Sequence, residues 1–66
     1  MARLHKGEKE YRLNRVSRLL NRCRLGLNEQ EVSEELGWDR RTTNNYLREL
    51  DQQEKAHRSG RKWYPG

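Results

Sequence analysis

The stretch from residue 27 to residue 50 most constrains the fold of this 66-residue chain, because it fits two short helices joined by a tight turn. Asn28 can cap a first helix over residues 29–36, and Glu31 can return a hydrogen bond to the backbone N–H of that cap. Gly37 follows, where a helix favours a left-handed residue at its C-terminal end. So short a connection predicts two helices that cross steeply.

The second helix of the pair is predicted over residues 40–52, with Asp39 as its N-cap. One face repeats at helical spacing through Thr43, Tyr46, Leu47 and Leu50. The opposite face carries the residues that we expect to read DNA bases, namely Arg40, Arg41, Asn44, Asn45 and Arg48. Arginine can make two bonds to guanine and asparagine two to adenine, and a helix fits the major groove. We therefore expect this helix to enter the major groove of double-stranded DNA.

The segment Leu36–Thr43 resembles the turn and recognition-helix start of bacterial winged helix-turn-helix transcription regulators, and the resemblance covers roughly residues 10–64. It implies a mainly α fold with a small β-hairpin, the three-helix winged helix-turn-helix, over residues 8–66. It also implies a transcriptional regulator, or the N-terminal DNA-binding domain of one. A homodimer would supply two DNA half-sites. In that family a buried valine or isoleucine is usual at the place of Thr43.

A longer helix is predicted over residues 8–24, and Gly26 ends it. Its apolar stripe consists of Leu13, Val16, Leu19, Leu20 and Cys23, and we interpret the cysteine as a core thiol. The remaining surface is strongly basic. Two explanations stay open for these cations, which are pairing with the acidic helix 29–36 and contact with phosphates.

The C-terminal residues 54–64 are predicted to form the wing, a β-hairpin that turns at Ser59-Gly60. Trp63 is expected to pack onto the helices. Two positions stay open for Tyr64, which are a core position beside Trp63, the favoured one, and stacking near the sugar-phosphate edge of the DNA. In the winged-helix family a glycine and a large aliphatic residue are common where this chain has Glu54 and Lys55. The residues expected to contact the DNA backbone are Thr42, Arg58, Ser59, Arg61 and Lys62.

Residues 1–7 are predicted to form a flexible basic arm, in which Arg3 and Lys6 are candidate DNA contacts. The net charge of +5 favours a polyanionic partner. Sixty-six residues permit one domain with a thin core. No apolar run is long enough for a membrane span or a signal peptide, so we expect a cytoplasmic protein, associated with the nucleoid in a bacterium or archaeon.

Enzymatic function is not expected. His5 and His57 join no cysteine or carboxylate at metal-ligand spacing, and neither a phosphate-binding glycine loop nor a nucleophile motif is present. We therefore expect no catalytic residue, no metal, no cofactor and no small-molecule ligand in this domain.

Two alternatives to duplex reading remain open. A winged helix can serve as a protein-interaction module, for which Trp38 would be the exposed apolar residue. The second alternative is a binder of Z-form nucleic acid, because Asn44 with Trp63 is partly similar to Zα domains. Those domains have a tyrosine where this chain has Arg48, and prolines where it has Arg61 and Lys62.

Overall fold

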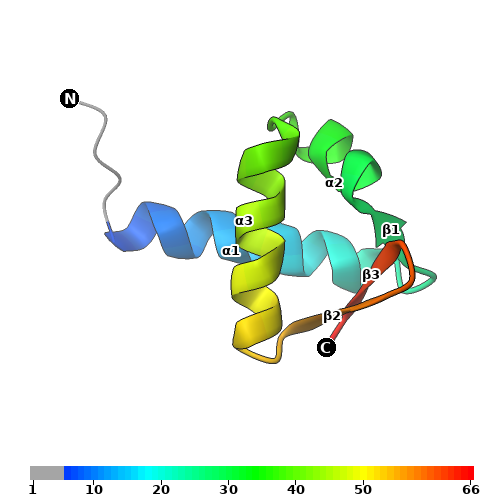
Figure 1. Ribbon diagram of the computed structural model, residues 1–66. Helices are drawn as coiled ribbons and strands as arrows, with labels where there is room; N and C mark the ends of the chain where they lie inside the picture. Colours follow the sequence, from blue (N-terminus) through cyan, green and yellow to red (C-terminus); the bar gives the residue numbers. More distant parts are fainter. Residues whose placement is uncertain (1–5) are drawn as a thin grey trace.

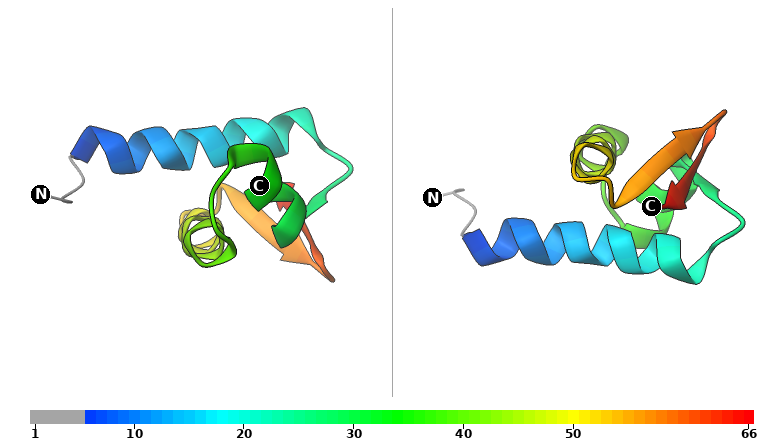
Figure 2. Two further views of the ribbon diagram at one scale, coloured as in Figure 1. Left: turned by 90° about the horizontal axis from the view of Figure 1, so that it is seen from above. Right: turned by 90° about the horizontal axis from the view of Figure 1, so that it is seen from below.

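The computed structural model describes residues 6–66, which form three helices and a small three-stranded antiparallel sheet (Figure 1). The helices are α1 (Lys6–Arg22), α2 (Glu29–Leu36) and α3 (Arg40–Gln52), and the strands are β1 (Leu27–Asn28), β2 (Ala56–Ser59) and β3 (Lys62–Pro65). The predicted fold class, mainly α with a C-terminal β-hairpin, is confirmed. α1 lies along one side of the molecule, and α3 and the hairpin β2–β3 lie together on the other side (Figure 2).

The helix α1 begins and ends two residues earlier than the predicted range 8–24. Lys6 and Gly7, which the sequence assigned to the arm, belong to this helix, whereas residues 1–5, including Arg3, lie outside the described residues. The C-terminal end changes because the N–H of Gly26 donates to the carbonyl of Cys23 at 2.9 Å, which closes a turn. Gly26 has a φ of 96°, in the region that favours glycine.

The predicted capping box at the start of α2 is confirmed. The Asn28 side chain accepts from the Glu31 N–H at 2.7 Å, and the Glu31 carboxylate accepts from the Asn28 N–H at 2.9 Å. The helix ends at Gly37, whose φ of 71° is left-handed and whose N–H donates to the Ser33 carbonyl. Both ends of this short helix are therefore fixed by local hydrogen bonds, as the sequence predicted.

The helix α3 begins at its predicted cap and ends in a Schellman motif. The Asp39 side chain accepts from the Thr42 N–H at 3.4 Å. At the other end the Lys55 N–H donates to the Leu50 carbonyl at 2.8 Å, and the Glu54 N–H donates to the Asp51 carbonyl at 3.0 Å. Glu54 occupies the left-handed position of this motif with a φ of 60°.

The sheet has the strand order β1-β3-β2, so its central strand is the last one in the chain. The hairpin turns through Gly60 and Arg61, one residue later than predicted, because Ser59 already pairs with Lys62. Gly60 has a φ of 66° at the first turn position, where a two-residue hairpin favours glycine. The strand β1 was not predicted from the sequence; in it Leu27 pairs with Trp63 and thereby ties the hairpin to the start of α2.

The core lies between the three helices and the sheet. Its buried apolar residues are Leu13, Val16, Leu19, Leu20, Val32, Leu47, Leu50, Ala56 and Trp63, and Cys23 and Tyr46 are among the half-buried residues packed against them. Thr43 is fully buried and donates its hydroxyl to the Asp39 carbonyl at 2.9 Å. The core thus fixes the buried face of α3 and leaves the opposite face to solvent.

Candidate nucleic-acid interface

The solvent face of α3 carries the predicted base-reading residues. Arg41, Asn45 and Arg48 are exposed and lie opposite the buried positions 43, 47 and 50 on the helix. Arg40 is also exposed, and Asn44 is half-buried on the flank of α3 that faces α2. Arg41, Asn45 and Arg48 therefore form the outer line of α3, whereas Arg40 and Asn44 lie on its flank toward α2.

The hairpin carries the predicted backbone-contacting residues, and Arg58, Ser59, Arg61 and Lys62 are all exposed. Arg58 extends over the buried ring of Trp63, with its guanidinium carbon 5.9 Å from the ring centroid. Arg58 also lines a hollow together with Asn44 and Arg48, so its side chain lies on the side of the hairpin that faces α3.

Two adjoining hollows separate α3 from the hairpin, and we call them together the α3–hairpin groove. The first hollow is lined by Asn28, Glu29, Gln30, Arg40, Arg58, Gly60, Arg61 and Trp63, and the second by Asn44, Arg48, Asp51, Arg58 and Trp63. Arg58 and Trp63 line both. The groove thus brings helix residues Arg40, Asn44 and Arg48 together with hairpin residues.

Asn45 does not line this groove. It borders a separate depression between α3 and the N-terminal half of α1, which also includes Lys9 and Thr42. The predicted residues therefore divide between a groove-facing flank and the outermost line of α3, rather than forming one uniform row.

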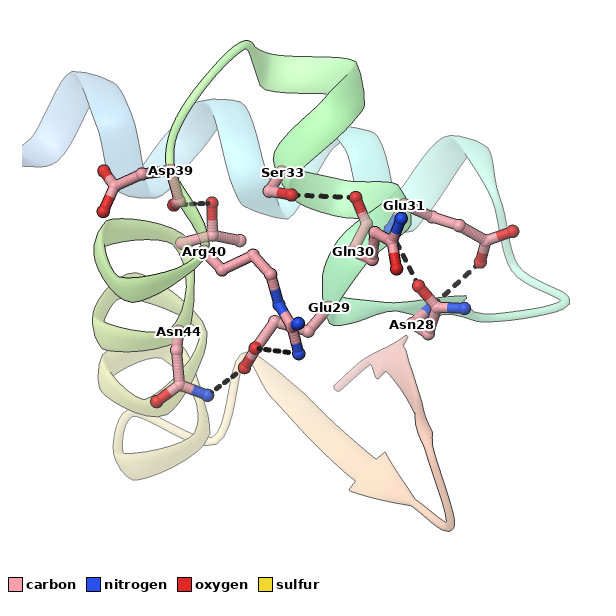
Figure 3. A network of polar contacts seen from close by, with 9 residues as sticks. Asn28, Glu29, Gln30, Glu31, Ser33, Asp39, Arg40 and Asn44 are labelled. Atoms are coloured by element: carbon pink, nitrogen blue, oxygen red, sulfur yellow. Dashed lines mark hydrogen bonds and ion pairs between the residues drawn. The ribbon is translucent and has the colours of Figure 1, made fainter.

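Two carboxylates of the groove were missed by the sequence analysis. Glu29, the first residue of α2, has its Oε1 at 3.3 Å from Arg40 Nη2, and its Oε2 accepts a hydrogen bond from Asn44 Nδ2 (Figure 3). Asp51 lies one helical turn beyond Arg48 and lines the second hollow. Helical spacing could have placed Asp51 on this flank, but no local signal links Glu29 to residues eleven and fifteen positions away.

The carboxyl group of Asp39, the N-cap of α3, has a pKa below the usual value for aspartate. A hydrogen bond from the Thr42 side chain is the main cause that lowers the pKa of the Asp39 carboxyl. Desolvation opposes this effect, and backbone N–H groups at the helix start add to it. Thr42, which the sequence assigned to the DNA backbone, thus also holds the cap of this helix.

The basic residues of α1 do not pair with α2 in the described part of the chain. Arg12 pairs with Glu8 of its own helix and Lys9 pairs with Glu49 of α3, each at 3.6 Å. Of the two explanations left open for these cations, pairing with the acidic α2 therefore has no ion pair within residues 6–66 to support it, although Glu35 of α2 lines the same depression as Arg15. Arg18 and Arg22 border a depression between α1 and α2, away from the α3–hairpin groove.

Trp38 is half-buried rather than exposed. The centroid of its ring lies 5.4 Å from the ring centroid of Tyr46 in α3. The guanidinium carbon of Arg12 in α1 lies 5.7 Å from the same Trp38 centroid. The side chain on which the protein-interaction alternative depended is thus packed within the fold.

Comparison of the chain with protein-family models, with curated proteins and with solved structures found no match. Among residues 6–66, no helix combines the length and apolar character that crossing a bilayer requires. In the same part of the chain, no three histidine, cysteine or acidic residues are grouped so that they could hold a metal ion.

Proposed function

We propose that this chain is a winged helix-turn-helix domain that binds double-stranded DNA in a sequence-dependent manner, with α3 in the major groove and the hairpin as a wing on the phosphate backbone. It would act in the cytoplasm as a transcriptional regulator, or as the DNA-binding domain of one. No catalytic step, cofactor, metal or small-molecule ligand forms part of this proposal.

The observation that carries the proposal is the continuity of exposed cationic and amide side chains from α3 across the α3–hairpin groove to the hairpin. Arg40 and Arg48 on the helix and Arg58 and Arg61 on the hairpin line the α3–hairpin groove. Arg41 is exposed on the outer line of α3, outside the lining of this groove. A helix about 10–12 Å in diameter matches a major groove about 12 Å wide. A hairpin beside it would then meet the adjacent sugar-phosphate strand.

A residue that reads bases and a residue that contacts the DNA backbone should differ in how their alanine variants change affinity and base preference. Arg41→Ala should cost about 1–3 kcal/mol on a preferred site and relax the base preference, because it removes a bidentate contact. Arg61→Ala should weaken all sequences alike and reduce the salt dependence by about one phosphate contact. Arg18→Ala removes the same charge from an exposed position outside the groove and serves as the matched control.

The experiment combines site selection from a random duplex library with fluorescence anisotropy at several salt concentrations. We expect a preferred site, a negative salt slope, and the ordering of variants given above. NMR titration with labelled protein should show shifted amides at residues 40–48 and 58–62. Equal effects of Arg41→Ala and Arg18→Ala on both affinity and preference would refute the assigned orientation of α3.

The two alternatives are outcomes of the same experiment. Binding to an alternating CG duplex held in the Z conformation, with none to B-form DNA, would favour a Z-form binder. No binding to either duplex at low salt would favour a protein-interaction module.

A further inference from the structure

Glu29 places a carboxylate between two of the predicted base-reading residues. Its two oxygens are divided, since Oε1 faces the Arg40 guanidinium at 3.3 Å and Oε2 accepts from the Asn44 side-chain amide (Figure 3). The contact joins α2 to the exposed flank of α3, so it links separate elements rather than neighbouring turns of one helix.

The backbone at Glu29 is held in place by its neighbour Asn28, which contacts both α2 and the sheet. Asn28, which precedes it, caps α2 through its side chain and also pairs with Lys62 of β3. The Glu29 side chain is only 25% exposed, whereas the Arg40 side chain above it is 68% exposed. The carboxylate therefore lies deeper in the α3–hairpin groove than Arg40, whose exposed side chain extends to it from the start of α3.

The contact orients both partners without using up their hydrogen-bonding capacity. A guanidinium has five N–H donors, so Arg40 keeps donors for a base or a phosphate. The Asn44 amide spends one N–H on Glu29, and its Oδ1 points away from the carboxylate (Figure 3). One acceptor and one further N–H remain, which is what a bidentate contact to adenine needs.

The same carboxylate opposes anions. Glu29 lies in a hollow that is also lined by Arg40, Arg58 and Arg61, where cations alone would attract any phosphate. An ionised carboxylate is only an acceptor, so it repels phosphate oxygens and tolerates donors such as the exocyclic amines of bases. The Glu29 carboxylate should therefore weaken sequence-independent binding to phosphates in this hollow more than it weakens a hydrogen-bonded contact with a base.

We propose that Glu29 is a positioning residue that sets the selectivity of α3: it holds Arg40 and Asn44 in one orientation and disfavours phosphate in the α3–hairpin groove. This inference rests on the proposed function, because it assigns the base preference of the same surface to a residue that reads no base itself.

The test compares Glu29→Ala with Glu35→Ala. Glu35 belongs to the same helix, is exposed, and has no ion pair or hydrogen bond from its side chain within residues 6–66, so its variant removes the same charge without the contact. Affinities are measured for the duplex selected by the wild type and for a random-sequence duplex. Glu29→Ala should reduce the ratio of the two affinities by about tenfold, mainly through tighter binding to the random duplex. Glu35→Ala should change both affinities alike and leave the ratio as it is.

A second readout needs no DNA. In NMR spectra of the free protein, Glu29→Ala should shift the Asn44 side-chain NH₂ signals and the Arg40 Nε signal, and Glu35→Ala should not. Unshifted Asn44 signals would overturn the positioning role. If the wild type binds duplex and both variants show the same affinity ratio, the selectivity role is wrong while the proposed function stands. If the wild type binds no duplex, the proposed function fails and this inference falls with it.

Discussion

Replacing Glu54 with glycine should stabilise the protein. Glu54 is the one residue other than glycine with a positive φ in the described part of the chain. Its conformation is held by the Schellman hydrogen bonds to Leu50 and Asp51, so it cannot relax without breaking the end of α3. α2 ends in the same left-handed conformation, but there the residue is Gly37.

The magnitude follows from two opposing terms. A residue with a Cβ in the left-handed region costs about 1–2 kcal/mol relative to the right-handed region. Glycine loses about 0.5–1 kcal/mol more backbone entropy on folding. The difference predicts that Glu54→Gly raises the free energy of unfolding by about 0.5–1 kcal/mol, which is about 2–8 °C in Tm for a domain of this size.

The assay is urea and thermal unfolding followed by circular dichroism, with Glu54→Ala as the matched control. Alanine removes the same exposed carboxylate but keeps the Cβ, so its unfolding free energy should stay within about 0.5 kcal/mol of the wild type. If Glu54→Gly is no more stable than Glu54→Ala, residue 54 is not held in the left-handed region and the argument is refuted.

Three further predictions concern the helix ends and the sheet. Because the pKa of Asp39 is lowered in the folded state, its carboxylate stabilises the protein above about pH 4, and this contribution is lost as the pH falls through the folded pKa. Asp39→Asn should therefore reduce the loss of unfolding free energy at acidic pH, measured by urea titration at several pH values. An unchanged pH profile would contradict this prediction. Asn28→Ala should lower the unfolding free energy by about 1 kcal/mol, since it removes the 2.7 Å cap bond, whereas no loss would mean that water replaces the cap. Gly26→Ala should cost about 1–3 kcal/mol, because its Cβ would lie 2.7 Å from the Tyr64 ring at a φ of 96°; wild-type stability in thermal unfolding would argue against this backbone.

The features predicted from sequence are those that local chemistry determines. The capping box of Asn28 and Glu31, the left-handed Gly37 and the Asp39 cap each need only residues within one turn of each other, and all are present. The burial of the apolar faces also followed from helical spacing, with Val16, Leu20 and Leu47 fully buried.

The features that the sequence did not predict depend on tertiary contacts. β1 has two residues and exists because β3 lies beside it, so no periodicity could indicate it. The contact of Glu29 with Arg40 and Asn44 requires the crossing of α2 and α3, whereas the sequence offered only pairing with α1, as one of two open explanations, for the acidic residues of α2. The earlier end of the first helix reflects the turn that Gly26 closes before β1.

At the junction of β1 and α2, the same residues affect both the stability of the fold and the proposed DNA interface, whereas elsewhere in the chain different residues affect each. On α3, a change at the buried Leu47 should affect mainly stability, and a change at the exposed Arg41 should affect mainly the proposed DNA interface. At the junction, Leu27 pairs with the hairpin, Asn28 caps α2, and Glu29 holds the flank of α3. A change that loosens the Asn28 cap should consequently displace Glu29 and disturb Arg40 and Asn44 as well as lower stability, whereas Glu54→Gly, at the far end of α3, should change stability alone.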